Sequence, residues 1–240
     1  MKRELVTLAA TLGLTLAAAV NASPVGVYIN DDFTTLDTAV WDTAYHTETG
    51  GNVYAAGSYV NVKAGSGWTS SLASKTALTP ASEDYYVKMT TTTLGYNDPY
   101  GYDDLFGLSS NPGGAGQDAY LRMVKYSDSN RGLYAYINNK TYKLAELGTY
   151  NNFDFTIIWT PSYVQFLKND VLWFDTRTTT PIEGGDWTIP AIAMKAYAIT
   201  YNNAETISAD RIKLEVVPEP AMVSLALLGA AALGLRRRRG

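Results

Sequence analysis

Residues 153–161 read FDFTIIWTP, and residues 163–172 read YVQFLKNDVL. Large apolar side chains alternate in both runs with polar or smaller ones, which is the two-residue period of a strand with one buried face. Asn169-Asp170 interrupts the second run, and both residue types tolerate the positive φ angles of tight hairpin turns. This stretch therefore predicts three consecutive antiparallel strands at 153–160, 163–168 and 171–174.

The remainder of the region between Ser23 and Val217 shows the same pattern. Short alternating runs recur with turn residues between them, and no helical periodicity extends beyond two turns. Asn138-Asn139 is a second two-residue hairpin turn. The chain has 18 Tyr, 5 Trp and 6 Phe, and tyrosine and threonine favour strands. These features predict an all-β sandwich or barrel with further strands at 59–63, 69–74, 85–94, 120–126, 132–137, 141–147, 194–201 and 207–216.

The opening of this region narrows the choice of fold. Asp31-Asp32-Phe33, Leu36-Asp37 and Trp41 resemble the first strand of concanavalin A-like lectin/glucanase domains. The stretch at 153–172 resembles the central hairpin of that family, in which a strand ending in Trp-Thr-Pro turns into a strand carrying Phe-x-Asn or Phe-x-Asp. The resemblance implies a two-sheet antiparallel jelly-roll sandwich, with the last strand, 209–216, returning beside the first.

The N-terminal segment has the layout of a secretory signal peptide. Lys2 and Arg3 are followed by an apolar run from Leu5 to Val20. Val20-Asn21-Ala22 places a small residue before Ser23, where we expect cleavage. The sequence therefore predicts a signal peptide at 1–22 and an exported domain at 23–216.

The C-terminal segment, 217–240, also has the layout of a sorting segment rather than of part of the domain. Pro218 and Pro220 keep their neighbours extended and out of helices, so we expect an exposed peptide here. The following run, 221–235, has no charge and would form a helix of about 22 Å, short of the ~30 Å hydrocarbon core of a bilayer. The arginines after it stay in the cytoplasm under the positive-inside rule, which places the domain on the other side.

Pro-Glu-Pro, an apolar helix and an arginine cluster in this order resemble the PEP-CTERM sorting signal of Gram-negative bacteria. The resemblance implies export, an inner-membrane precursor held by 221–235, and processing by an exosortase, often in connection with extracellular polysaccharide. An ordinary C-terminal anchor without processing is the alternative. The residues that carry this motif are Val217, Pro218, Glu219, Pro220, Arg236, Arg237, Arg238 and Arg239.

Charge and composition exclude several partners. Without its two end segments, the region 23–217 keeps 13 basic and 21 acidic residues, a net charge of −8. An acidic domain is a poor partner for nucleic acid or anionic lipid. The chain has no cysteine and only one histidine, His46, which argues against disulfides and against a zinc site.

The residues of a glycosidase are not evident either. Glycosidases of the resembled family carry carboxylates on one strand in a Glu-x-Asp-x-x-Glu pattern, where alternation places them on one face. No such pattern occurs, and the pair Glu83-Asp84 points to opposite faces of a strand. His46 has no Gly-x-Ser-x-Gly elbow to accompany it and is interpreted as an exposed loop residue. We therefore expect no catalytic activity.

A loop rich in tyrosine and aspartate is the best candidate for a ligand site. Aromatic rings can stack on the apolar faces of sugars while aspartates accept hydroxyl protons, so the mixture favours glycan recognition. The alternative is a packed loop whose tyrosines cover a sheet edge. The candidate residues are Tyr96, Asp98, Tyr100, Tyr102, Asp103 and Asp104.

A structural Ca²⁺ is implied by the family resemblance, since concanavalin A-like domains often hold one where the first and last strands meet. Asp32 and Asp210 are expected in those strands, with a backbone carbonyl of Gly50-Gly51 as a third ligand. Two solvated aspartates are the alternative.

Together these observations predict an exported cell-surface or matrix protein with a non-catalytic sandwich that binds carbohydrate or has a structural role. A glycoside hydrolase or lyase acting on extracellular polysaccharide is one alternative. A surface protein that binds no ligand is the other.

Overall fold

The computed structural model describes residues 23–43, 52–64, 70–96, 104–112, 114–127, 130–146, 152–200 and 206–219. These residues form sixteen β-strands and their connections. Within them we find no helix that is long and apolar enough to cross a membrane. The predicted signal peptide, 1–22, and the apolar run, 221–235, lie outside the described residues.

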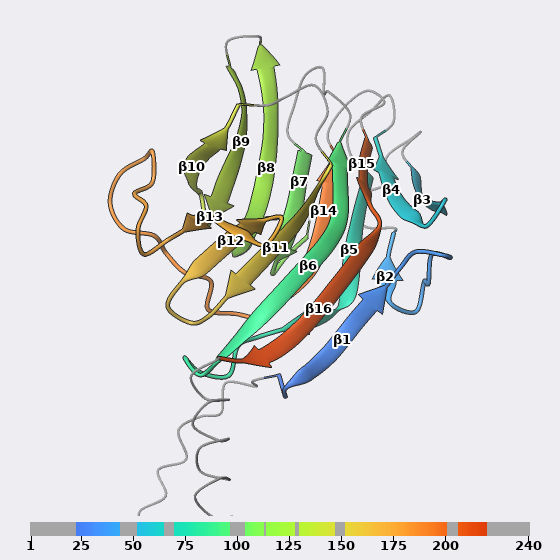
Figure 1. Ribbon diagram of the computed structural model, residues 1–240, viewed down its shortest axis with the longest axis horizontal. Helices are drawn as coiled ribbons and strands as arrows, with labels where there is room; N and C mark the ends of the chain where they lie inside the picture. The colour runs from blue at the N-terminus through green and yellow to red at the C-terminus, as the bar shows by residue number, and fades with distance from the viewer. Residues whose placement is uncertain are drawn as a thin grey trace, which may run out of the picture.

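The strands form two sheets that pack face to face, and each pairing within them is antiparallel (Figure 1). The larger sheet has the order β13 (Val171–Asp175), β12 (Val164–Lys168), β11 (Phe153–Trp159), β6 (Tyr85–Tyr96), β15 (Thr206–Ala209), β4 (Tyr59–Lys63) and β3 (Asn52–Ala56), and β16 (Arg211–Pro218) pairs with β6 and with β1 (Gly26–Asp31). The smaller sheet has the order β10 (Lys140–Ala145), β9 (Asn130–Ile137), β8 (Asp118–Ser127), β7 (Asp104–Ser109), β14 (Met194–Thr200), β5 (Ser70–Leu78) and β2 (Trp41–Asp42). The predicted two-sheet jelly-roll sandwich is confirmed.

The predicted hairpins are confirmed as well. β11, β12 and β13 are neighbours in the larger sheet. Asn169 and Asp170 join β12 to β13 with φ angles of 51° and 62°, and Asn138 and Asn139 join β9 to β10 with φ angles of 45° and 66°. Since a left-handed conformation costs Asn and Asp less than other residues with a side chain, these pairs fix the register of both hairpins.

Aromatic side chains fill the space between the sheets. Phe106 of β7 packs edge-on against Phe155 of β11, with ring centres 6.3 Å apart, so the contact joins the two sheets. Phe155 also packs against Phe166, at 5.3 Å. Trp159 is fully buried and donates through Nε1 to the carbonyl of Pro190. The large apolar residues that alternate along 153–159 therefore form the inner face of β11.

The opening motif has a different role from the one predicted. Asp31 is the last residue of β1, residues 32–37 follow it outside any strand, and Trp41 begins β2 of the smaller sheet. Asp31 accepts hydrogen bonds from Trp41 Nε1 at 2.6 Å and from the Phe33 N–H at 2.8 Å. The motif therefore closes one end of the core, where Phe33 and Trp41 are buried with ring centres 5.6 Å apart.

The last strand lies beside β1, as expected, but extends further than expected. β16 continues through Val217 to Pro218, which lie opposite Tyr86 and Tyr85 of β6. Pro218 and Glu219 are half-buried rather than exposed. The expectation of a freely exposed peptide is wrong for these positions, because Pro218 pairs with β6 and Asp84, just before β6, accepts the N–H of Glu219.

Candidate functional site

A row of tyrosines crosses the outer face of the smaller sheet. The register places Tyr136 of β9 opposite Tyr120 of β8, Tyr120 opposite Gly107 of β7, and Gly107 opposite Tyr197 of β14. Directly opposed residues lie on the same face of a sheet. The residues between them in sequence are buried against the larger sheet, so this row points away from it. We call the surface formed by Tyr120, Tyr134, Tyr136, Tyr197, Asp118 and Arg122 the tyrosine face.

Two tyrosines of this face form a stack. The rings of Tyr120 and Tyr136 have centres 4.5 Å apart and are inclined by only 4°. The guanidinium carbon of Arg122 lies 5.9 Å from the centre of the Tyr136 ring. Burial raises the pKa of both phenols further above neutral pH, where a tyrosine hydroxyl is already protonated.

Only part of the tyrosine face is accessible to solvent. Tyr120 and Tyr197 are 8% and 4% exposed, whereas Tyr134 and Tyr136 are half-buried. Tyr134 lies opposite Arg122, one row from the stack. The accessible part of the face is therefore over β8 and β9, where a ring, a guanidinium and phenol hydroxyls lie together.

Gly107 makes the stack possible. A Cβ atom at this position would lie 2.4 Å from the carbonyl oxygen of Ala119 and 2.6 Å from Cα of Tyr120. Both distances are far below van der Waals contact with backbone atoms, which cannot move aside. The absence of a side chain lets β7 approach β8 closely beneath Tyr120.

Asp118 supplies the acceptor of the face. It lies on β8 two residues before Tyr120, so the two side chains share a face. Burial raises the pKa of Asp118, and a hydrogen bond with Ser109 opposes that rise. A half-buried carboxyl group with a raised pKa is a common feature of binding and catalytic sites.

Asp118 and Asp42 share this face but lie far apart. Asp42 of β2 lies opposite Ala73, and four strand spacings separate β2 from β8. At ~4.8 Å per strand this is about 19 Å. Glycosidases need a separation of roughly 5 to 9.5 Å, so these two cannot act as a catalytic pair.

The loop predicted to bind a ligand is described only at its ends. Tyr96 is the last residue of β6, in the larger sheet, and Asp104 is the first of β7, in the smaller sheet. The loop thus crosses from one sheet to the other. Asp98, Tyr100, Tyr102 and Asp103 lie outside the described residues, so this site stays a prediction.

The predicted calcium ligands lie beside their strands rather than in them. Asp32 follows β1, and Asp210 separates β15 from β16. Asp32 accepts hydrogen bonds from the N–H and hydroxyl of Thr34, which lower its pKa. No group of three acidic or histidine side chains occurs within the described ranges, and Gly50-Gly51 lies outside them. The described residues alone do not make a calcium site, and Ca²⁺ stays a prediction.

A hollow of about 560 Å³ lies at the end of β13, but its tryptophan has a structural role. Trp187 donates through Nε1 to the carbonyl of Thr179 at 2.9 Å. Its ring packs edge-on against Phe174, at 5.2 Å. The ring therefore anchors the connection from β13 to β14 and is not a free stacking platform.

Sequence reasoning missed the tyrosine face, although it predicted the strands that carry its tyrosines; it predicted neither β7 nor the start of β8 at Asp118. The indication was present, because Tyr120 and Arg122, and likewise Tyr134 and Tyr136, are spaced by two residues in adjacent strands. The spacing does not reveal which tyrosine lies opposite which. That information is in the register.

Comparison with solved structures identifies the fold as the concanavalin A-like lectin/glucanase sandwich. The chain is similar to the Emp46p carbohydrate recognition domain, with 10% identity, a TM-score of 0.53, and 77% of this chain and 94% of that chain covered. It is similar to Rv0315 of Mycobacterium tuberculosis, described as a pseudo beta-1,3-glucanase. The identity is 11% and the TM-score 0.51, and the match covers 81% of this chain and 99% of that chain. It is also similar to a prokaryotic beta-1,3-1,4-glucanase (lichenase) from a mouse hindgut metagenome. The identity is 10% and the TM-score 0.50, and the match covers 78% of this chain and 98% of that chain.

No family model matches the chain, and no curated protein matches it in sequence. At such low identities the solved structures establish the architecture alone. They include lectin and glucanase domains, so the choice between binding and catalysis depends on this chain's own residues.

Proposed function

We propose that this is an exported protein whose sandwich binds extracellular polysaccharide on the tyrosine face without cleaving it. The observation that carries the proposal is the stack of Tyr120 and Tyr136 with Arg122 beside it and Asp118 on the same strand. Aromatic rings offer an apolar surface to a sugar ring, while the carboxyl, guanidinium and phenol groups bind hydroxyls. An acidic domain is suited to neutral glycans.

The proposed route to the cell surface depends on the two end segments. The signal peptide at 1–22 directs export, and the segment 221–235 holds the precursor in the inner membrane. An exosortase then recognises the Pro-Glu-Pro tag, Pro218 to Pro220, and delivers the domain to the surface or the polysaccharide matrix. The order of these sequence elements supports this part of the proposal.

The absence of catalysis is part of the proposal. Asp118 and Asp42, on the outer face of the smaller sheet, are too far apart for either glycosidase mechanism. A hydrolase would need another carboxylate, and Glu146 and Glu183, which bind Lys143 and Thr141 of β10, are the ones to test. In a surface protein without ligand, the half-buried ring of Tyr136 would serve packing alone.

The test is a glycan array with residues 23–219, with and without Ca²⁺. We expect Tyr136→Ala to weaken binding about tenfold, because a stacked ring contributes ~1.4 kcal/mol to an aromatic contact. Tyr54→Ala removes a 37% exposed tyrosine of β3 in the other sheet and serves as the control. It should leave binding unchanged.

The same array separates the alternatives. Loss of binding in Tyr100→Ala or Tyr102→Ala, with Tyr136→Ala unaffected, would move the site to the loop before β7. Dependence on Ca²⁺ that disappears in Asp32→Ala would support the predicted calcium site. Release of sugar from any polymer would establish an enzyme, and no binding to any glycan would end the carbohydrate proposal.

A further inference from the structure

The start of the Pro-Glu-Pro tag is joined to the sandwich by its backbone. Val217 and Pro218 continue the pairing of β16 with β6. The N–H of Glu219 then donates to the carbonyl of Asp84, at 2.7 Å. Pro218 has no N–H of its own, so this bond extends the attachment past the proline.

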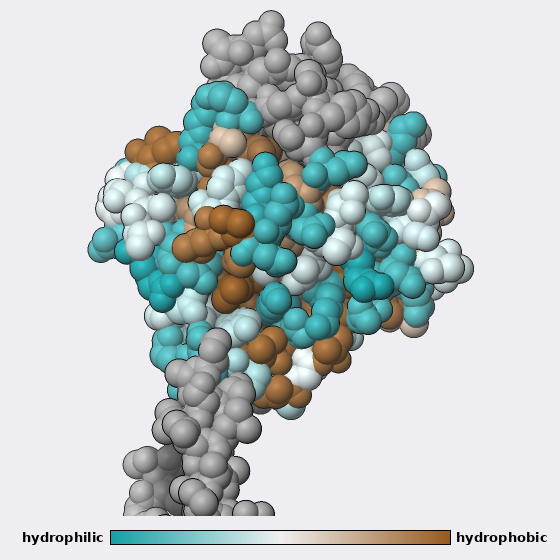
Figure 2. Space-filling model, viewed as in Figure 1, coloured by the Kyte–Doolittle hydropathy of each residue, from teal (hydrophilic) through white to brown (hydrophobic). Residues whose placement is uncertain are grey.

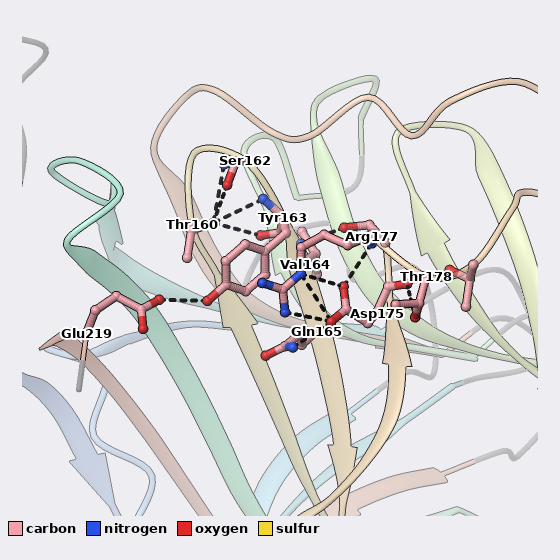
Figure 3. Close-up of polar contacts among 11 residues, drawn as sticks. Thr160, Ser162, Tyr163, Val164, Gln165, Asp175, Arg177, Thr178 and Glu219 are labelled. Atoms are coloured by element: carbon pink, nitrogen blue, oxygen red, sulfur yellow. Dashed lines mark hydrogen bonds and ion pairs between the residues drawn. The ribbon is translucent and has the colours of Figure 1, made fainter. Parts of the chain in front are cut away.

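The side chain of Glu219 is bound as well. The hydroxyl of Tyr163 donates to Glu219 Oε1 at 2.6 Å (Figure 3). Burial and the neighbouring Glu219 carboxylate raise the pKa of Tyr163, so its hydroxyl keeps the proton that it donates. A hydrogen bond to a charged acceptor is stronger than one between neutral groups.

Arg177 completes the surroundings of this carboxylate. Its guanidinium carbon lies 3.9 Å from the centre of the Tyr163 ring, in a cation–π contact. Glu219 contributes to the raised pKa of Arg177, after the larger effect of the hydrogen bonds to Asp175. The Glu219 carboxylate therefore accepts from a hydroxyl whose ring lies against a positive charge.

The residues that receive Glu219 are themselves held in place. The N–H of Tyr163 donates to Thr160 Oγ1, and its carbonyl accepts from the N–H of Thr160, both at 3.0 Å. Arg177 donates through Nη2 and Nε to the buried Asp175, at 2.7 and 3.0 Å (Figure 3). Such support keeps donors oriented before their partner arrives.

A further contact joins the two attachment points of Glu219. Ser162, beside Tyr163, donates through Oγ to Glu83 Oε2 at 2.7 Å. Glu83 directly precedes Asp84, whose carbonyl accepts the Glu219 N–H. The backbone partner and the side-chain partner of Glu219 thus belong to one connected corner of the sandwich.

From these contacts we infer that Tyr163 and Arg177 form a recognition site for the tag's own glutamate, and that this site restrains processing. Enzymes that act on a peptide commonly bind it as an extended strand through backbone groups. Here the backbone of Val217 to Glu219 is already engaged by β6 and Asp84. The tag becomes available only when the end of β16 separates from the sandwich. The inference rests on the proposed sorting function.

The experiment has two readouts on the full chain, both using Tyr163→Phe, which leaves the tag unaltered. The first is amide hydrogen exchange at Val217 and Glu219 in detergent micelles. We expect exchange to be about tenfold faster in the variant, because a hydrogen bond to a charged group is lost. The second is a pulse–chase measurement of tail removal in a host that has an exosortase, where we expect a similar acceleration.

Tyr54→Phe is the matched control, since it removes a hydroxyl from β3 at the far edge of the larger sheet. It should change neither readout. Unchanged exchange in Tyr163→Phe would overturn the inference. Faster exchange with an unchanged processing rate would overturn the restraint on processing. Faster exchange with no tail removal in either protein would support the recognition site but reject the proposed sorting function.

Discussion

The outer faces of the two sheets share the same strand geometry and differ in chemistry. On the larger sheet, Lys88 lies opposite Glu215, and Lys213 contacts Glu215 on the same strand at 2.5 Å. Figure 2, viewed as in Figure 1, shows mainly hydrophilic surface here, with separate hydrophobic patches. The smaller sheet instead carries the tyrosine stack. Single exposed apolar residues are ordinary on a solvated face, whereas a cluster of aromatic rings is a feature of binding surfaces.

Two aspartates show the same contrast. Asp175, at the end of β13, is buried, yet its bonds from Arg177 and Gln165 outweigh burial and lower its pKa. Asp118, on the tyrosine face, has a pKa raised by burial. A carboxylate that is hydrogen-bonded to an arginine stabilises the folded state. A buried carboxylate without such a charge beside it lowers stability, and proteins tolerate that loss at functional sites. Substitutions on each of the two sheets test the difference between them.

The largest effect is expected at Gly107. Gly107→Val should reduce the free energy of unfolding by about 3 kcal/mol, because its side chain meets the backbone of β8. Urea unfolding measures the change. Gly57→Ala, in an open turn with φ of +60°, should cost only ~1 kcal/mol through backbone strain. Equal stability of the wild type and Gly107→Val would show that the close approach of β7 and β8 is not required.

Asp175→Asn should reduce stability by about 1 to 2 kcal/mol at pH 7, allowing for the half-exposed arginine. The pKa of Asp175 is lower in the folded than in the unfolded chain. Its stabilisation is therefore complete above the unfolded pKa of ~3.9 and is lost as the pH falls through the folded pKa. Urea unfolding at pH 7 and pH 3 should show the wild type converging on the variant. A constant difference would contradict this.

Asp118→Asn should have the opposite sign, with a gain of about 1 kcal/mol or less at pH 7 since the carboxyl is partly solvated. The pKa of Asp118 is higher in the folded chain. The wild type is therefore penalised once the pH exceeds the unfolded pKa, and the variant's advantage should disappear below about pH 4. Glycan affinity should fall in the same variant. Lower stability with unchanged affinity would make Asp118 a structural residue.

The smallest effect is expected on the larger sheet. Lys213→Ala should change stability by about 0.5 kcal/mol or less, because its ion pair with Glu215 is partly exposed and screened by salt. Thermal unfolding at low and high salt measures it, and glycan binding should not change. A marked loss of binding would place the glycan on the larger sheet and contradict the proposed site.

Much of the architecture could be predicted from the sequence. The alternation of Phe155, Ile157 and Trp159 identified a buried strand face, and all three are at most 1% exposed. Asn138-Asn139 and Asn169-Asp170 identified hairpins. These features depend on residues within a few positions of one another, so they can be recognised without knowing the fold.

The candidate sites could not be predicted in this way. Tyr120, Gly107 and Tyr197 are far apart in sequence and meet only because β8, β7 and β14 pair in one register. Tyr163 and Glu219 are likewise brought together by strands that neighbour β6 on its two sides.

The sequence by itself therefore determined that this chain forms β-strands, which residues face its core, and which ends have the pattern of sorting segments. The tertiary structure decided which tyrosines stack, which aspartate is matched by an arginine, and that Glu219 is bound to the sandwich. The physical reason is range: alternation and turn preference act along a few neighbouring residues, whereas strand register is set by the packing of the whole core.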